Sequence, residues 1–341
     1  MPIKIQENIS LSKYTSFKIG GLARYFCAVE NITEIKEALE FAGKNKLKIF
    51  VLGGGSNLLV SDSGFKGLVI KIQDTRYKIQ TNNEIFAGCG LSLAKLVSES
   101  VKAGLTGLEW AAGIPGTVGG AVCNNSGAYG KCMGDVVEEV KIIRWLHSPH
   151  RSGAVEPERE RLADRFHSPA GLWNQRIVEK LKNKQCQFSY RDSIFKREKK
   201  YIILNVVLKL KKRDGLKSRE KISEYLKSRM EKQPLQYPSA GSVFRNPVLD
   251  DDHLKKLIKE NPELESISKD NTIPAGWFIE ALGLKGKKIG GAMVSEKHGN
   301  FIVNTGNAKA EDVAILISLI KQKVRDDFEV QLREEIEYVG F

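Results

Sequence analysis

Apolar residues recur at two different spacings along the chain, and each spacing predicts a different kind of element. Helical spacing over residues 33–43, 93–101 and 310–324 predicts amphipathic helices with one buried face. Ser92 precedes the second of these segments and is placed to cap that helix with its hydroxyl. Short apolar runs rich in β-branched residues predict buried strands, and they occur over 49–52, 69–72, 136–143 and 201–210.

These helices and strands alternate without an internal repeat, so we expect a mixed α and β fold in at least two units. A domain boundary is expected near residue 213, because the composition becomes helical and basic beyond it.

Residues 146–184 do not follow either pattern. The segment is rich in Arg–Glu pairs and poor in apolar residues, which favours a loop or insertion over a domain. Within it, the apolar positions of 171–182 predict a short helix. His147 and His150 have no Cys or His partners at zinc spacing, so we interpret them as a chance surface pair and expect no metal site.

The composition is that of an ordinary globular protein. Of 341 residues, 41% are hydrophobic and 28% are charged, which excludes global disorder and a collagen-like chain. No run approaches the roughly 18–20 apolar residues of a membrane span, and the first residues lack the apolar stretch of a secretory signal. The five cysteines include no CxxC pair, which fits a reducing compartment. We therefore expect a cytoplasmic protein without membrane insertion.

The net charge of +13 is the one unusual feature of the composition. Most of the excess lies in residues 196–232, where fourteen basic and five acidic residues leave a net of 14 − 5 = +9. Such a segment is either a solvated surface or a basic rim that attracts phosphate-bearing ligands. A nucleic-acid-binding protein is the alternative from another class. The chain has no recognition-helix, RRM or zinc-finger signature, so nucleic acid is not an expected partner.

A glycine-rich loop, GGGSN at 53–57, directly follows a predicted strand. Glycines allow consecutive amides to surround an anion, and Ser56 and Asn57 add side-chain donors. The loop lacks the ending of a Walker A motif and the spacing of a dinucleotide fingerprint. Taken alone, it is equally well explained as a tight turn.

A second glycine cluster occupies residues 113–121 and continues through Asn124–Gly130. Four glycines and a proline within nine residues argue against a long helix and permit close approach of a ligand. Two such loops about 60 residues apart are harder to explain as turns. Together they suggest an extended cofactor with a diphosphate bridge, in a flavin fold other than the Rossmann fold.

Both glycine clusters, together with further motifs in the same order, resemble the MurB family of UDP-N-acetylenolpyruvoylglucosamine reductases. The resemblance covers nearly the whole chain except 146–184. The further motifs are Tyr14–Gly21, Tyr190–Ser193, Ser239–Pro247, Ala275–Trp277, Ser295–Phe301 and Leu332–Ile336. The spacing between the third and fourth of them is similar to the family form that lacks an extra tyrosine-bearing loop.

The resemblance implies an α+β protein in three parts. Residues 1–213 would form an FAD-binding domain of the PCMH, or vanillyl-alcohol-oxidase-like, type, built from two subdomains and carrying the atypical insertion at about 146–184. Residues 214–325 would form a MurB-type α/β substrate domain. Residues 326–341 would return to the active site.

The implied activity is the NADPH-dependent reduction, through noncovalent FAD, of UDP-N-acetylglucosamine-enolpyruvate to UDP-N-acetylmuramate in peptidoglycan synthesis. The enzyme would be a monomer that binds a UDP-sugar. The alternative within the same fold is another PCMH-type flavin oxidoreductase. Many of those attach FAD covalently through His or Cys, and no His lies near either glycine cluster.

The resemblance also assigns catalytic residues. The family's arginine falls on Arg191, its proton-donating serine on Ser242 and its acid on Glu335. Taken singly, these residues are more simply explained as a surface arginine, a turn residue and an exposed acid. The family's C-terminal motif reads Leu-Glu-Pro-Glu and this chain has Leu332–Glu335, so Glu334 is the alternative acid.

Two further sets of residues follow from the same correspondence. Substrate contacts would come from Tyr190, Asn246, Lys297 and His298. Cofactor contacts would come from Tyr14, Thr15, Gly53, Gly54, Gly55, Ser56, Asn57, Gly113, Gly116, Thr117, Gly119, Gly120, Asn125 and Ala128.

Overall fold

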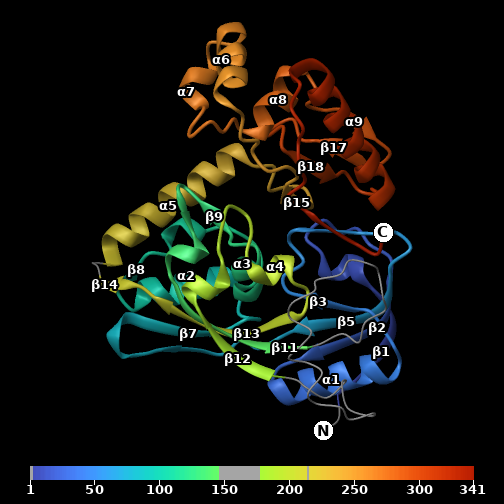
Figure 1. Cartoon of the computed structure of the whole chain (residues 1–341), viewed down its shortest axis with the longest axis vertical. Coiled ribbons are helices and arrows are strands. Elements are labelled where there is room, and N and C mark those ends of the chain that lie inside the picture. The colour runs from blue at the N-terminus through green and yellow to red at the C-terminus, as the bar shows by residue number, and fades with distance from the viewer. Residues whose placement is uncertain (1–2, 146–176, 213–214) are drawn as a thin grey trace, which may run out of the picture.

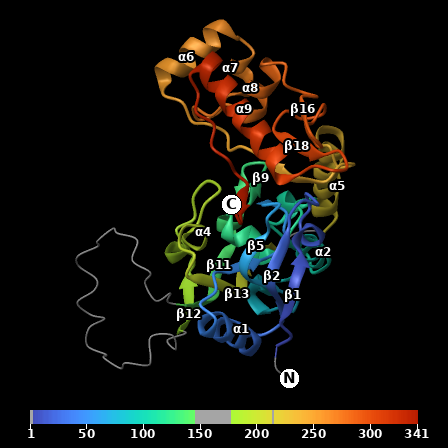
Figure 2. The ribbon, with the colours of Figure 1, turned by 90° about the vertical axis from the view of Figure 1, so that its right-hand side faces the viewer.

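A computed structural model describes residues 3–145, 177–212 and 215–341. Two units lie one above the other along the long axis of the molecule (Figures 1 and 2). We name them the N-terminal unit, which ends at residue 212, and the C-terminal unit, which begins at residue 233. The His147–His150 pair and most of the expected insertion lie outside the described residues.

The first sheet of the N-terminal unit has the strand order β1-β2-β5-β3, with β2, β5 and β3 parallel and β1 antiparallel at one edge. The predicted helix over 33–43 is α1, and its apolar face packs against this sheet in a large buried cluster. The elements are β1 (Gln6–Ser10), β2 (Leu22–Val29), α1 (Ile32–Lys44), β3 (Ile49–Leu52) and β5 (Phe65–Ile72).

The second sheet is antiparallel, in the order β12-β11-β13-β7-β6. Its inner side chains join the same buried cluster as the first sheet, so the two sheets share one core. Helix α2 also packs there, and the Ser92 hydroxyl accepts a hydrogen bond from the Lys95 amide, which confirms the predicted cap. The elements are β6 (Tyr77–Ile79), β7 (Glu84–Gly88), α2 (Leu93–Lys102), β11 (Val137–Arg144), β12 (Ile177–Lys182) and β13 (Tyr201–Lys209).

The helix expected over 171–182 is wrong for residues 177–182, which form the edge strand β12. This strand pairs with β11 through Val178 opposite Ile143 and Leu181 opposite Val140. Pairing with a neighbouring strand therefore decides the conformation here, and local apolar spacing does not.

The C-terminal unit is built on a sheet in the order β15-β18-β17-β16. Helix α9 covers this sheet with one buried apolar face, as helical spacing predicts for 310–324. The residues of that face are Val313, Leu316, Ile317, Ile320 and Val324. The elements are β15 (Ser239–Ser242), α6 (Asp251–Glu260), α7 (Leu264–Ile267), α8 (Ala275–Ala281), β16 (Lys288–Ile289), β17 (Ala292–Val294), β18 (Phe301–Asn304) and α9 (Ala310–Phe328).

Several connections join the two units. The C-terminal strand β19 (Glu337–Val339) pairs in parallel with β4 (Leu58–Val60) of the N-terminal unit. Phe17 and Leu59 of the N-terminal unit are buried in the core of the C-terminal unit. Helix α5 (Gly215–Lys232) runs along the N-terminal unit and reaches the base of the C-terminal unit (Figure 1).

The start of α5 is fixed to the N-terminal unit by a buried hydrogen bond. The Ser218 hydroxyl donates to Oε1 of Glu109 at 2.6 Å, and Glu109 lies in a 3₁₀ turn. The boundary at 213 and the three-part division stay predictions, because α5 contacts residues of both units. None of the helices in the described residues is long and apolar enough to cross a membrane.

Candidate functional site

The two glycine clusters meet at one place in the N-terminal unit. A Cβ atom on Gly54 would lie 2.4 Å from Cα of Gly116, so only glycine allows the loops to come this close. The Ser56 hydroxyl donates a hydrogen bond to the Pro115 carbonyl at 3.1 Å and links the same loops. Segments about 60 residues apart thus form one continuous glycine-rich surface.

This surface carries backbone amides without partners. Within the described residues, the amides of Gly54, Gly55, Ser56, Gly116 and Thr117 donate no hydrogen bond. Consecutive free amides in glycine-rich turns form a concave site for phosphate oxygens. The chemistry of the surface therefore fits the diphosphate of FAD, and its residues are among those that the family resemblance assigns to the cofactor.

Lys71 lies beneath this surface. Its ammonium donates a hydrogen bond to the Gly53 carbonyl, and burial lowers the pKa of the Lys71 side chain. Sequence reasoning did not identify Lys71 as a site residue. A lysine within the apolar strand β5 is the signal that marks it, because a lysine in such a strand needs a specific partner.

Several predicted cofactor residues use their side chains to fix the local backbone. The Thr15 hydroxyl donates to the Ile19 carbonyl at 3.0 Å. Buried Asn125 donates to the Ser189 carbonyl and accepts from the Gly134 amide, both at 2.8 Å. These contacts hold the loops in shape around the glycine-rich surface.

Arg191 and Glu335 form an ion pair in which Nε lies 2.7 Å from Oε1. The two residues are far apart in sequence, and neither is more than a quarter exposed. Nη1 of Arg191 also donates to the Gly127 carbonyl at 2.8 Å, in β9 (Gly127–Ala128). Nη2 has no hydrogen-bond partner within the described residues. The guanidinium is thus held on one side and remains available on the other.

The backbone of Glu335 is held from both units. The Asn57 side-chain amide donates to the Glu335 carbonyl at 3.0 Å, and the Glu335 amide donates to the Val243 carbonyl at 2.7 Å. Val243 directly follows Ser242, the last residue of β15. The structure thereby brings the segments of Arg191, Ser242 and Glu335 together beside the GGGSN loop.

Glu334, the alternative acid, faces a different partner. Its Oε1 accepts a hydrogen bond from Nζ of Lys321 in α9 at 2.9 Å. The ion pair with Arg191 favours Glu335 as the acid of the site.

Two further cations near Arg191 were not identified from the sequence. Nζ of Lys196 donates to the Arg191 carbonyl at 3.3 Å. Burial lowers the pKa of Lys196, and the positive charge of Arg245 lowers it further. Lys196 and Arg245 lie in basic or polar stretches of the sequence. In such stretches, nothing in the sequence distinguishes a lysine or arginine that lines a binding site from one that is exposed to solvent.

The four predicted substrate residues differ in exposure and in their hydrogen-bond partners. Tyr190 is 55% exposed and its ring centroid lies 5.6 Å from the Arg191 guanidinium carbon. Asn246 accepts a hydrogen bond from the Ala275 amide at 3.0 Å, at the start of α8. Nδ1 of His298 accepts from the Asn300 amide at 3.1 Å, and burial lowers the pKa of this imidazole. Nζ of Lys297 donates to the Met230 carbonyl of α5 at 2.5 Å.

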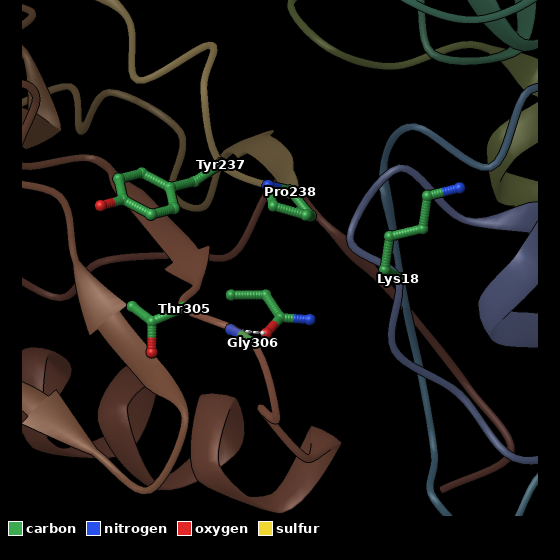
Figure 3. Close-up of a pocket in the computed structure, with 6 residues that line it drawn as sticks. Lys18, Tyr237, Pro238, Thr305 and Gly306 are labelled. Carbon is green, nitrogen blue, oxygen red and sulfur yellow. Dashed lines mark hydrogen bonds between the residues drawn. The ribbon is translucent and has the colours of Figure 1, made fainter.

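A separate pocket opens between the two units (Figure 3). Lys18 lies on one side of it, with Tyr237 and Thr305 on the other. The pocket contains none of the predicted site residues. The described residues also include no cluster of three or more His, Cys, Asp or Glu side chains that could hold a metal ion.

Comparisons with known proteins agree with this arrangement. The family model for an FAD binding domain matches residues 23–145, and the model for the UDP-N-acetylenolpyruvoylglucosamine reductase C-terminal domain matches residues 233–339. These matches confirm the expected fold class.

The UDP-N-acetylenolpyruvoylglucosamine reductases of Acaryochloris marina and Bacillus pumilus are each 36% identical to the chain. They align with 99% of it and with 93% and 94% of their own lengths. The crystal structure of MurB from Thermus caldophilus is similar with a TM-score of 0.71 and 30% identity, over 99% of this chain and 100% of that one. The chain belongs to the UDP-N-acetylenolpyruvoylglucosamine reductase family and is an FAD-dependent oxidoreductase.

Proposed function

We propose that this chain reduces UDP-N-acetylglucosamine-enolpyruvate to UDP-N-acetylmuramate for peptidoglycan synthesis, with NADPH as the hydride source. Family membership supports this reaction. The structural observation that supports assigning it to particular residues is that the Arg191–Glu335 ion pair lies beside the glycine-rich surface. Bound FAD supplies the chemistry of hydride exchange, and the free amides of Gly54–Ser56 and of Gly116 and Thr117 would hold its diphosphate.

Arg191 is proposed to bind the carboxylate of the enolpyruvyl group. Hydride addition to the β-carbon drives negative charge toward this carboxylate, and a planar guanidinium meets a carboxylate with two parallel donors. The ion pair with Glu335 orients the guanidinium and leaves Nη2 available for the substrate. Glu335 would act by holding the guanidinium in the orientation that meets the developing charge on the substrate carboxylate.

Ser242 is proposed to donate the proton that the α-carbon takes up. A serine hydroxyl is a weak acid, so this role requires a fixed position close to the reacting carbon. Ser242 ends β15 and pairs with Phe301 of β18, which fixes its backbone. A Cβ atom on the preceding Gly241 would meet nothing within 4 Å, so the approach to Ser242 from this side is open.

Tyr190, Asn246, Lys297 and His298 are proposed to contact the UDP-sugar, with Lys297 serving the diphosphate. Nucleotide-linked sugar and NADPH are both cytoplasmic metabolites, so the proposed reaction belongs in the cytoplasm. The proposed monomeric state is measured by light scattering of the purified protein.

The reaction is tested with the purified protein under anaerobic conditions. NADPH should bleach the absorbance of the oxidised flavin, and the enolpyruvyl substrate should restore it and yield a product with two added hydrogens. UDP-N-acetylglucosamine, which lacks the enolpyruvyl group, serves as the control and should not restore the absorbance. Protein that is colourless and does not take up FAD would overturn the proposal, as would flavin that stays reduced with the substrate.

A further inference from the structure

Arg229 is a half-buried cation near the end of α5 whose side chain has no hydrogen-bond or ion-pair partner in the described residues. Its Nε is shielded from solvent and makes no hydrogen bond there. No described carboxylate lies within ion-pair distance of its guanidinium, in contrast to Arg191, which has Glu335. Burying a charge without a partner is costly, so such a residue indicates an anionic group that the protein binds.

Aromatic contacts hold Arg229 in place. Tyr225 lies one turn earlier on α5 and stacks on Tyr129 with ring centroids 3.9 Å apart and planes 13° from parallel. The Arg229 guanidinium carbon lies 5.7 Å from the centroid of Tyr129. The opposite end of the helix is fixed by the hydrogen bond from Ser218 to Glu109. The helix is therefore anchored along its length, and Arg229 projects from a fixed support.

The side chain of Arg229 lies directly over the second glycine cluster. A Cβ atom on Gly113 would be 2.8 Å from Cδ of Arg229, and the backbone of Gly113 has a φ of +76°. Both features require glycine at position 113. The space that this glycine leaves is filled by an arginine.

Arg229 lies within electrostatic reach of Arg191. Burial lowers the pKa of Arg229, and the nearby positive charge of Arg191 lowers it further. The two positive charges are thus near enough to repel each other, and within the described residues Glu335 pairs with Arg191 while no carboxylate pairs with Arg229. An anion contributed by a ligand would relieve their repulsion.

The position of Arg229 indicates which negatively charged part of a ligand it would contact. The free amides that fit a diphosphate lie at Gly54–Ser56 and at Gly116 and Thr117. Arg229 lies at Gly113, toward Arg191, where the proposed hydride exchange occurs. Hydride transfer from NADPH would release NADP⁺ and deliver two electrons and one proton to bound FAD, which adds one negative charge that residues around the ring would have to accommodate. The ring gives up this charge when the hydride passes to the substrate.

We propose that Arg229 stabilises the negative charge that the bound flavin ring carries after it accepts a hydride. Arg229 would thereby raise the reduction potential of the cofactor, since positive charge near the ring favours its reduced form. Tyr129 and Tyr225 would act as positioning residues for the guanidinium. This inference rests on the proposed function, because it takes the ring to lie at the Arg191 end of the glycine-rich surface.

The test is the midpoint potential of the bound FAD, measured by equilibration with a redox dye without NADPH or UDP-sugar. In Arg229→Met, the reduction equilibrium should shift at least tenfold toward the oxidised form, which is a fall of about 30 mV for a two-electron couple. Arg229→Lys should recover part of the shift. Arg219→Met is the matched control, because Arg219 is an exposed arginine of the same helix, and its potential should stay at the wild-type value.

A potential in Arg229→Met equal to that of Arg219→Met would overturn the inference, and so would a rise in the KM for the UDP-sugar at unchanged potential. If Arg229→Met is recovered without FAD, Arg229→Lys and Arg229→Gln replace it, and wild-type potentials in both would contradict the inference. The dye measurement needs neither substrate, so its failure is distinguishable from failure of the proposed reductase reaction.

Discussion

The side-chain amide of Asn57 donates a hydrogen bond of 3.0 Å to the backbone carbonyl of Glu335. A residue of the glycine loop in the N-terminal unit thus holds the acid that the last segment of the chain contributes. The bond couples the surface proposed for the cofactor to the pair proposed for the substrate carboxylate, because Glu335 is also bound to Arg191.

Replacing Asn57 should therefore affect the second half of the reaction more than the first. In Asn57→Ala, the free amides of the loop remain, so FAD should stay bound and NADPH should bleach it at a near-normal rate. Reoxidation by the enolpyruvyl substrate should slow by about 10–100-fold, since small displacements of a catalytic group have effects of this size. Stopped-flow absorbance of the flavin measures both steps. The control is Asn307→Ala, which alters an exposed asparagine; equal reoxidation rates in the two variants would refute the coupling.

Removing the hydroxyl of Ser242 should separate the two hydride steps. In Ser242→Ala, bleaching by NADPH should persist, while reoxidation by substrate should slow by about 10²–10⁴-fold, the usual contribution of general acid catalysis. Rapid-mixing absorbance of the flavin measures both rates. Ser239→Ala, at the start of the same strand, is the matched control and should behave as the wild type. Normal turnover in Ser242→Ala would mean that another group donates the proton.

The two neighbouring acids should respond differently to the loss of charge. Glu335→Gln removes the partner of Arg191 and should lower kcat/KM by two orders of magnitude or more, as expected for a group in the reacting site. Glu334→Gln breaks only a partly exposed pair with Lys321, and such pairs contribute about 0–1 kcal/mol to stability. Steady-state kinetics of the two variants decide the question, and a larger loss at residue 334 would assign the role to that acid instead.

Buried Glu109 should make the stability of the protein depend on acid pH. Burial raises the pKa of this carboxyl, but hydrogen bonds from Ser218, Thr106 and the Gly107 amide outweigh it, and the net pKa is lowered. A carboxyl with a lowered pKa in the folded state stabilises the fold above the unfolded pKa of about 4.3 and loses this contribution as the pH falls through the folded value.

The measurement is the free energy of unfolding in urea, compared between Glu109→Gln and the wild type from neutral pH to below about pH 4.3. The wild type should be more stable at neutral pH by about 1.5–3 kcal/mol, the range for hydrogen bonds to a charged group. The difference should shrink below about pH 4.3. Glu220→Gln, at an exposed position on α5, should show no such convergence, and a constant gap for Glu109→Gln would argue against a titrating contribution.

The sequence predicts much of the fold, because apolar spacing reports which face of an element is buried. It places α1, β3, β13 and the buried face of α9 correctly. It fails at β12, whose conformation depends on pairing with β11, a partner that local spacing does not contain. The family resemblance assigns the site residues, and the structure adds what links them, such as the hydrogen bond from Asn57 to the backbone of Glu335.

Arg229 illustrates the limit of sequence reasoning more clearly. It is one of fourteen basic residues within 196–232, and nothing in the local sequence separates it from its exposed neighbours. Its difference arises from the path of α5 over Gly113, which is a tertiary relationship. By contrast, Lys71 could have been recognised from the sequence as a candidate site residue, because it is a lysine within the apolar strand β5.

The parallel pairing of β19 with β4 has a consequence for how the protein matures on the ribosome. The chain emerges N-terminus first, so β4 and the glycine loop beside it are made long before residues 337–339. Until those residues leave the exit tunnel, β4 lacks its partner and Arg191 lacks Glu335. Synthesis of residues 335–339 is thus required to complete the site, and a chain that stops before them lacks both the strand pairing and the ion pair.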